Sequence, residues 1–193
     1  MAASPDAPPV PRQWPDTSPL LAGVHAFDEA VDTWVASHRH PVADRLFYGL
    51  SSAADHSILW FALGALQSAR RSDAARGVRL AVAIASESII TNGIVKSFFR
   101  RVRPVLEAAD GPLPFGMRQP VTSAFPSGHA TSAFMAAVVL SEGARSVPPY
   151  FALAGLVAAS RVYVRMHHAS DVVAGAAFGL ALGLIARRVI PRP

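Results

Sequence analysis

Three short segments hold most of the polar side chains that could carry out chemistry. They are residues 96–104 (KSFFRRVRP), 126–129 (PSGH) and 160–171 (SRVYVRMHHASD). The first and third are rich in cations: arginine binds a phosphoryl group through two parallel hydrogen bonds, and lysine binds it as a point charge. The second has the small residues of a helix start. Together they indicate a site for a phosphorylated substrate.

Five positions could hold the phosphoryl oxygens. Three of them are cations from the first and third segments: Lys96, Arg103 and Arg161. Ser127 and Gly128 come where a helix is expected to begin, and free backbone N–H groups there favour an anion.

Two histidines could carry the reaction. His167 and Asp171 are four residues apart and therefore share one helical face. A carboxylate in that position can accept a hydrogen bond from one imidazole nitrogen and leave the other nucleophilic. His129 supplies a second imidazole, suited to act as general acid for a leaving oxygen.

Each segment also has an ordinary explanation. A basic cluster can anchor a helix end at a membrane surface, Pro-Ser-Gly is a common helix start, and a lone histidine often packs near an interface. The occurrence of all three, in order and on one side of the expected helices, favours the phosphate site.

The three segments resemble the signature of the type 2 phosphatidic acid phosphatase (PAP2) superfamily, Lys-x6-Arg-Pro, Pro-Ser-Gly-His and Ser-Arg-x5-His-x3-Asp. His168 stands where this family usually has an aromatic residue, and the spacing assigns the nucleophile to His167 instead. The signature positions are met by Lys96, Arg103, Pro104, Pro126, Ser127, Gly128, His129, Ser160, Arg161, His167 and Asp171.

The resemblance implies a two-step phosphoryl transfer that uses no metal and no cofactor. His167 would attack phosphorus, Asp171 would hold its tautomer, and His129 would protonate the leaving group and later activate water. The phosphoryl oxygens would be bound by Lys96, Arg103, Arg161, Ser127 and the Gly128 N–H.

The elements that must position these residues are helices. Apolar stretches at about 55–69, 78–97, 128–144, 148–165 and 170–189 predict five membrane spans of borderline length, because a span needs about 20 residues. Gly175, Gly179 and Gly183 form a ladder of small residues that permits close helix contact. Glu87 lies within a span, where we expect it to make a polar contact between helices.

The N-terminal part differs from the rest. Residues 1–20 contain six prolines and predict a disordered tail, followed by a PAP2-like membrane domain over 21–193. Within that domain, 21–38 has the periodicity of an amphipathic helix lying on the membrane or against the bundle. We therefore expect an all-α polytopic bundle with about five spans and this additional helix.

Composition agrees with a membrane protein. Charged residues are only 16% of the chain, against about 25% in average soluble domains, and 51% are apolar. The net charge of +5 is not gathered into one stripe, so nucleic-acid binding is not expected. The absence of cysteine excludes a disulfide framework.

The expected function is hydrolysis of a membrane lipid phosphate: a polyprenyl phosphate, a polyprenyl diphosphate or a glycerolipid phosphate. The Ala-, Val- and Arg-rich composition is similar to that of actinobacterial proteins, in which one small branch of the superfamily acts on a decaprenyl-linked phosphoribose. The alternatives are a vanadate-dependent haloperoxidase, whose soluble members are larger, and a lipid-phosphate binder without turnover. The sequence does not decide whether the chain forms a homo-oligomer.

The loops opposite the three segments are basic, which predicts their side of the membrane. They contain Arg70, Arg71, Arg76, Arg79, Arg145, Arg187, Arg188 and Arg192. By the positive-inside rule these loops are cytoplasmic, which places the site on the external face of the cell membrane.

Overall fold

The computed structural model describes residues 18–104, 119–120 and 122–190. Within these ranges it is all-α, as predicted, with seven α-helices and short 3-10 and π segments. The elements are α1 (Pro19–Ser37), α2 (Pro41–Ala53), η1 (Asp55–Ser57), α3 (Ile58–Arg71), α4 (Ala74–Ser88), η2 (Ile89–Ile94), η3 (Val95–Phe98), α5 (Gly128–Leu140), α6 (Pro148–Tyr163) and α7 (Ala169–Val189).

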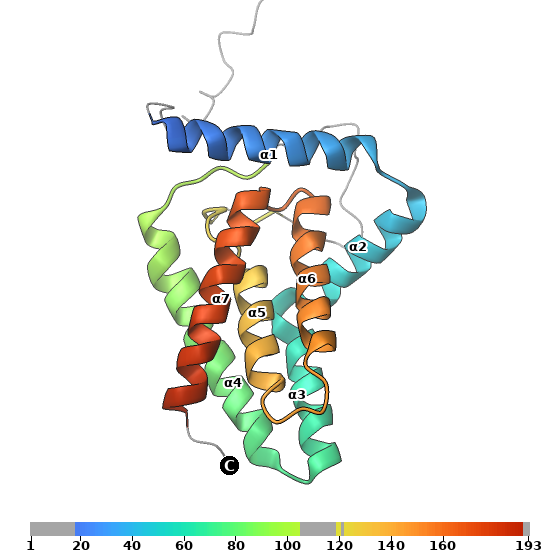
Figure 1. Ribbon diagram of the computed structural model, residues 1–193, viewed down its shortest axis with the longest axis vertical. Coiled ribbons are helices and arrows are strands. Elements are labelled where there is room, and N and C mark those ends of the chain that lie inside the picture. Colours follow the sequence, from blue (N-terminus) through green and yellow to red (C-terminus); the bar gives the residue numbers. More distant parts are fainter. Residues whose placement is uncertain (1–17, 105–118, 121, 191–193) are drawn as a thin grey trace, which may run out of the picture.

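The amphipathic segment forms α1, which lies across one end of the bundle that α3 to α7 make (Figure 1). It begins two residues before the predicted start, because Pro19 suits the first helical position and the Ser18 hydroxyl accepts a hydrogen bond from Leu21 N at 3.2 Å. Pro19 and Leu20 thus belong to the helix and not to the predicted tail, of which residues 1–17 lie outside the described residues.

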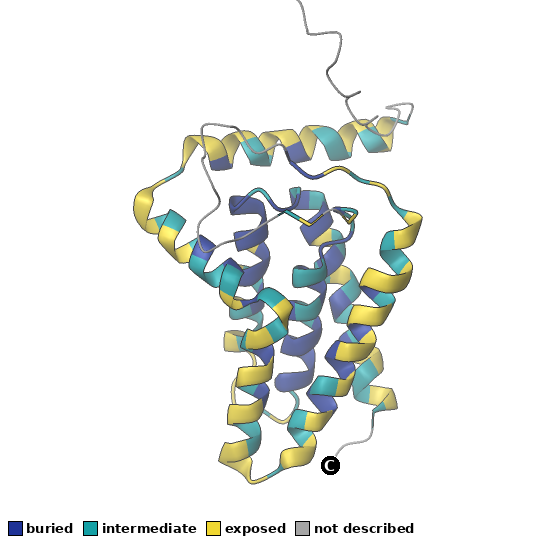
Figure 2. Ribbon diagram, turned by 180° about the vertical axis from the view of Figure 1, so that it is seen from behind, coloured by how far each residue is buried: buried dark blue, intermediate teal, exposed yellow. Residues whose placement is uncertain are grey.

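Helix α5 is the centre of the bundle. Nine of its 13 residues are buried, and Figure 2 shows it as the dark core that the other helices surround. The same helix carries Gly128 and His129 at its first turn. The core therefore fixes one of the three predicted segments directly.

The glycine ladder brings α7 against α5. A Cβ atom at Gly179 would lie 2.2 Å from the carbonyl oxygen of Thr131, and one at Gly183 would lie 2.7 Å from Cβ of Val138. Both distances are shorter than any real contact, so only glycine permits this approach. The predicted role of the ladder is confirmed.

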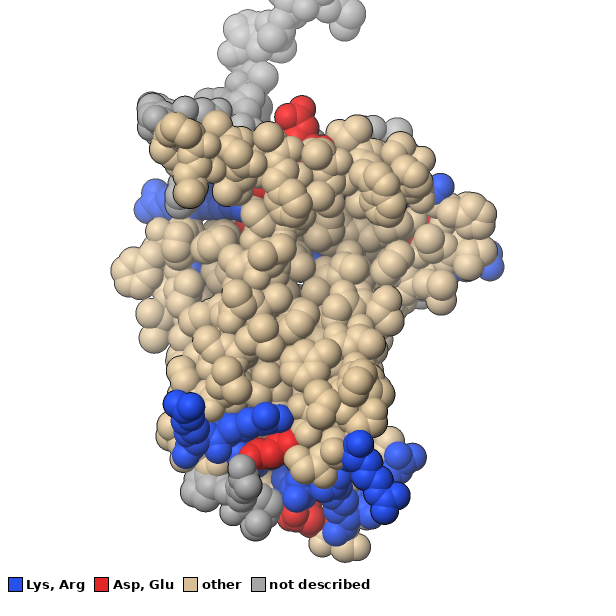
Figure 3. Space-filling model, in the orientation of Figure 1, with Lys and Arg blue, Asp and Glu red and all other residues tan. Residues whose placement is uncertain are grey.

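Two helical runs are long and apolar enough to cross a membrane, Ala74–Phe98 and Ala169–Val189. The other three expected spans are present as shorter helices: α3 has 14 residues, α5 has 13 and α6 has 16. On the face that Figure 3 shows, the surface between the two ends of the bundle is nearly free of charged side chains. Apolar side chains are exposed on α3, α4, α6 and α7, among them Phe61, Val82, Leu156, Val173 and Leu184.

The run 74–98 is not uniform. Glu87 is buried, and its carboxylate accepts a hydrogen bond from the Ser132 hydroxyl of α5, which confirms the predicted polar contact between helices. Two residues later the chain enters the π segment η2, and single-turn π segments are frequent at functional sites. Asn92 and Lys96 come to lie beside Gly128 as a result.

Candidate active site

The three segments predicted from the sequence meet at the end of the bundle that α1 covers (Figure 1). Ser127 N donates a hydrogen bond to the carbonyl oxygen of Asp171 at 3.0 Å, which joins the second segment to the third. Arg103 lies 3.2 Å from His167 and joins the first to the third. The site is thus built from the ends of helices that are distant in sequence.

His167 is held in the turn between α6 and α7. The backbone N–H groups of Met166 and His167 both donate to the carbonyl oxygen of Arg161, at 3.0 and 3.1 Å. Arg165 has a φ of 53°, an uncommon backbone conformation for a residue with a side chain, which reverses the chain here. The imidazole is only 2% exposed.

The tautomer of His167 follows from its neighbour. Nη1 of Arg103 lies 3.2 Å from Nε2 of His167, and because a guanidinium has only donors, Nε2 is the acceptor. Its lone pair therefore points to a cation, where a phosphoryl group would bind. Burial lowers the pKa of His167 to about 3, although Asp171 acts in the opposite direction. The imidazole is neutral, as a nucleophile must be.

Arg103 is anchored by carbonyl groups on both sides of the site. Its Nη1 donates to Met166 O at 2.6 Å and its Nε to Pro120 O at 3.1 Å. Burial lowers the pKa of Arg103, against the influence of Asp171. The guanidinium is rigid and largely removed from water, which strengthens its attraction for an anion.

Lys96 and Arg161 complete a group of three cations with Arg103. The charge of Lys96 interacts with the charges of both arginines. Nζ of Lys96 lies 3.7 Å from the position that a Cβ at Gly128 would occupy, so the lysine reaches the N-terminus of α5. Three cations this close repel one another unless an anion lies between them.

Ser127 and Gly128 are where the sequence places them, at the start of α5. The Ser127 hydroxyl caps the helix by accepting from Ala130 N at 3.4 Å, which leaves its hydrogen for a phosphoryl oxygen. Gly128 is the first residue of α5, where the free backbone N–H groups of a helix favour an anion.

Asp171 differs from the expectation. Its Oδ2 lies 3.8 Å from Nδ1 of His167, too far for a hydrogen bond. The carboxylate accepts instead from His168 N at 2.9 Å and from Nη1 of Arg101 at 2.6 Å. Because it also caps the first turn of α7, the helix start and the arginine decide its position.

Arg101 and Asp28 are site residues that the sequence reasoning missed. Arg101 bridges Asp171 to Asp28 of α1, and Asp28 also accepts from the backbone N and the hydroxyl of Ser170, at 2.8 and 2.7 Å. Asp28 is buried, whereas Glu29, the next residue of the same helix, is exposed. Asp28 lies on the apolar side of the amphipathic pattern, and this position could have indicated from the sequence that it is buried.

His168 faces away from the cations. Its Nδ1 lies 3.3 Å from Oδ2 of Asp32 on α1, and its backbone begins α7. This arrangement supports the spacing argument that assigns the nucleophile to His167.

His129 lies at the first turn of α5 and meets a partner that none of the three segments contains. Its Nε2 is 2.7 Å from Oδ1 of Asp55, in the short η1 segment between α2 and α3.

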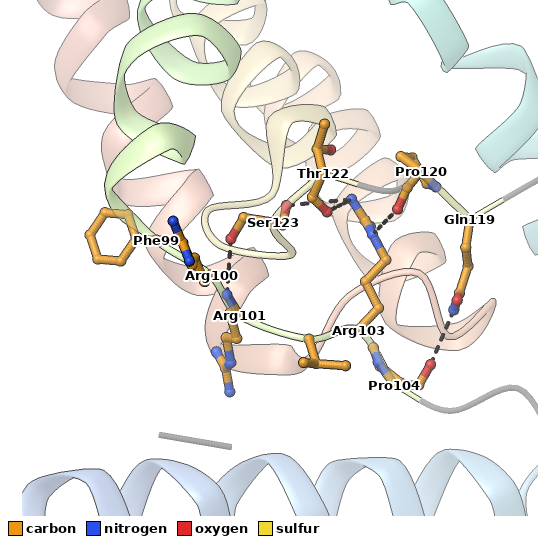
Figure 4. A pocket seen from close by; sticks show the side chains of 10 residues that line it. Phe99, Arg100, Arg101, Arg103, Pro104, Gln119, Pro120, Thr122 and Ser123 are labelled. Atoms are coloured by element: carbon orange, nitrogen blue, oxygen red, sulfur yellow. Dashed lines mark hydrogen bonds between the residues drawn. The ribbon is translucent and has the colours of Figure 1, made fainter. Parts of the chain in front are cut away.

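A cavity of about 620 Å³ opens next to the site, lined by residues 99–104, 119, 120, 122 and 123. Figure 4 shows Arg103 extending along it toward the carbonyl groups of Pro120 and Thr122. Arg103 lines this cavity and also contacts His167. No group of three or more His, Asp or Glu side chains among the described residues is placed to hold a metal ion.

The chain is similar in sequence and in fold to known proteins. Residues 76–193 match the model of the PAP2 superfamily. Over 144 residues the chain is 34% identical to the decaprenylphosphoryl-5-phosphoribose phosphatase of Mycobacterium tuberculosis. This match covers 71% of this chain and 75% of that protein.

Two solved structures have the same fold. The transmembrane PAP2-type phosphatidylglycerolphosphate phosphatase of Bacillus subtilis matches with a TM-score of 0.70 and 24% identity, over 88% of this chain and 89% of that one. LpxE of Aquifex aeolicus matches with a TM-score of 0.66 and 28% identity, over 82% and 93% of the two chains. The chain therefore belongs to the PAP2 superfamily and is a homologue of its membrane phosphatases.

Proposed function

We propose that this protein hydrolyses the phosphate ester or diphosphate of a membrane lipid through a phosphohistidine intermediate. The observation that carries the proposal is the convergence of Lys96, Arg103 and Arg161 around the neutral Nε2 of His167. A phosphoryl group is the anion that three such cations and a helix N-terminus bind best.

In the first step Nε2 of His167 attacks phosphorus and the bond to the lipid oxygen breaks. The lipid oxygen takes a proton from His129, and the negative charge that grows on the other oxygens is stabilised by the three cations. The N–H groups at the start of α5 and the Ser127 hydroxyl contribute to the same stabilisation.

In the second step water attacks the phosphohistidine. His129, which is now neutral, accepts the proton of that water, the P–N bond breaks, and inorganic phosphate is released. His167 returns to its starting tautomer with Nδ1 protonated. Asp171 lies one short movement from Nδ1 and would stabilise the imidazole while its charge is positive.

The substrate class follows from the setting of the site. It lies at an end of the bundle whose sides expose apolar residues, where a lipid headgroup would meet the cations while the chain remains in the bilayer. We favour a polyprenyl-linked phosphate, because the curated relative described above acts on a decaprenyl-linked phosphoribose phosphate. A glycerolipid phosphate is the second candidate, in line with the phosphatidylglycerolphosphate phosphatase of the same fold.

We further propose that residues 21–193 form one membrane domain in which α3, the run 74–98, α5, α6 and α7 cross the bilayer. The short helices are compatible with crossing because the site and α1 occupy the headgroup region at one end. Basic side chains gather at the other end (Figure 3), and by the positive-inside rule this supports a cytoplasmic position for that end and an external position for the site.

The test is phosphate release by the purified protein in detergent from a polyprenyl phosphate, a polyprenyl diphosphate, decaprenylphosphoryl-5-phosphoribose and phosphatidic acid. We expect release from at least one lipid, undiminished by excess EDTA and inhibited by orthovanadate, which mimics the five-coordinate transition state. A rapid acid quench with labelled substrate should not retain label, whereas an alkaline quench should, because phosphohistidine is acid-labile. Activity that is lost with EDTA and restored by magnesium would contradict the mechanism.

A further inference from the structure

His129 is held by a carboxylate from outside the matched family region. Nε2 of His129 lies 2.7 Å from Oδ1 of Asp55, and because a carboxylate only accepts, the ring nitrogen is the donor. Asp55 precedes residues 76–193, over which the superfamily model matches. None of the three signature segments therefore supplies it.

The same carboxylate faces a phosphate-binding cation. Nη1 of Arg161 lies 3.7 Å from Oδ1 of Asp55 and contacts the hydroxyl of the buried Ser51 at the end of α2. Burial would raise the pKa of Asp55, but the hydrogen bond from His129 and the nearby charges of His129 and Arg161 outweigh it and lower the pKa. Asp55 is thus a carboxylate under the conditions of the reaction.

The strained backbone that follows Asp55 holds this residue close to His129. His56 and Ser57 follow with φ of 53° and 60°, two consecutive residues with side chains in the left-handed region. Such a conformation is unfavourable for a residue with a side chain and persists only where the surrounding structure determines it. The kink ends α2, begins α3 and directs Asp55 toward the first turn of α5.

We propose that Asp55 is a positioning residue for the general acid: it fixes His129 through Nε2 so that Nδ1 delivers the proton to the lipid oxygen. The site then contains two carboxylate–histidine pairs, Asp171 with the nucleophile and Asp55 with the acid. This inference rests on the proposed function.

The proton balance is simple. When the negatively charged phosphoryl group of the substrate is bound, His129 enters the first step protonated on both nitrogens, and the Asp55 carboxylate stabilises that cation. Nδ1–H transfers to the oxygen as the P–O bond breaks, and Nε2–H stays bonded to Asp55. In the second step Nδ1 accepts a proton from the attacking water.

The role predicts a dependence on the leaving group. Asp55→Asn should lower kcat for octyl phosphate, whose alkoxide needs protonation, by about 100-fold or more, because general acid catalysis contributes typically 10²–10⁴-fold. It should leave kcat for p-nitrophenyl phosphate within about threefold, because nitrophenolate leaves without a proton. His129→Ala should show the same split, and Asp55→Asn/His129→Ala should be no slower than His129→Ala alone.

Two variants separate this role from the other contacts of the region. Ser51→Ala disturbs Arg161 without touching His129, so its effect should be equal for both substrates. Asp44→Asn removes a contact from α2 to Tyr163 of α6 and likewise leaves His129 untouched. If Asp55→Asn slows both substrates equally, or mainly raises KM, the proposal is wrong and Asp55 serves Arg161.

Folding is checked by the thermal midpoint of each variant. If Asp55→Asn does not fold, Asp55→Glu decides: its displaced carboxylate should slow octyl phosphate more than p-nitrophenyl phosphate, and an equal loss rejects the proposal. A wild-type protein that hydrolyses neither these probes nor any lipid phosphate would instead reject the proposed function.

Discussion

His167 and Asp171 face each other one helical turn apart, yet the closest approach of Nδ1 to Oδ2 is 3.8 Å because Arg101 and the start of α7 hold the carboxylate. Hydrogen bonds at active sites are often long before substrate binds and shorten in the reacting complex. In this protein a small rotation of either side chain would close the pair.

His167→Ala should abolish phosphate release, because no other imidazole has its nitrogen against Arg103. His168→Ala is the matched control: its ring faces Asp32, so kcat should fall less than about tenfold. Phosphate release and the thermal midpoint should be measured for both variants. An inactive His168→Ala beside an active His167→Ala would show that the nucleophile has been misassigned.

Arg101→Gln should lower both stability and activity. Removing one member of a buried ion pair leaves the other uncompensated and costs about 3–5 kcal/mol, and Asp171 is fully buried. Arg100→Gln, at the exposed neighbouring position, should change neither the thermal midpoint nor kcat. Equal midpoints for the two variants would mean that the bridge from Asp28 to Asp171 contributes nothing to stability.

Gly179→Ala should destabilise the protein by about 1–3 kcal/mol, the usual cost of overpacking, because the added Cβ meets the backbone of Thr131. At Gly155 on α6, no atom of the residues that the structure describes lies within 4 Å of the Cβ that Gly155→Ala would add. It should be neutral or stabilising by up to about 1 kcal/mol, since alanine is the better helix former. Thermal unfolding in detergent compares the two directly.

The lowered pKa of His167 predicts a loss of stability in acid. Well above pH 6.5 the imidazole is neutral in both the native and the unfolded chain, so its protonation does not change the free energy of unfolding. Between pH 6.5 and about 3 only the unfolded chain is protonated, so stability falls as pH falls.

At pH 5 the free energy of unfolding should be lower by about 2 kcal/mol from this cause, which corresponds to a thermal midpoint lower by about 4–8 °C. His167→Asn does not titrate at this position and should lack that contribution. The midpoint of the wild type should therefore drop more between pH 7.5 and pH 5 than that of the variant. Parallel curves would show that the native imidazole keeps an ordinary pKa.

The proposed topology can be read by labelling in intact cells. The chain has no cysteine, so Ser72→Cys in the exposed turn between α3 and α4 and Ala36→Cys on α1 can each be tested alone. A membrane-impermeant thiol reagent should label position 36 and not position 72. The reverse pattern would place the site in the cytoplasm.

Much of the architecture was predictable because it depends on local chemistry. Apolar periodicity located α1 and the five expected spans, most of their bounds to within a few residues, and the glycine ladder of α7 indicated its close contact with α5. The residue types and their spacing within the three segments were enough to predict a phosphate site. Their placement on one side of the bundle followed from the order of the helices alone.

What only the tertiary structure decided are the contacts between residues far apart in the chain. Asp28 reaches Arg101 across 73 positions and Asp55 reaches His129 across 74, and an isolated aspartate in a helical pattern carries no signal of its partner. The carboxylate of Asp171 was likewise expected at His167 from spacing. Its position is set by Arg101, because a buried carboxylate takes the strongest donor within reach.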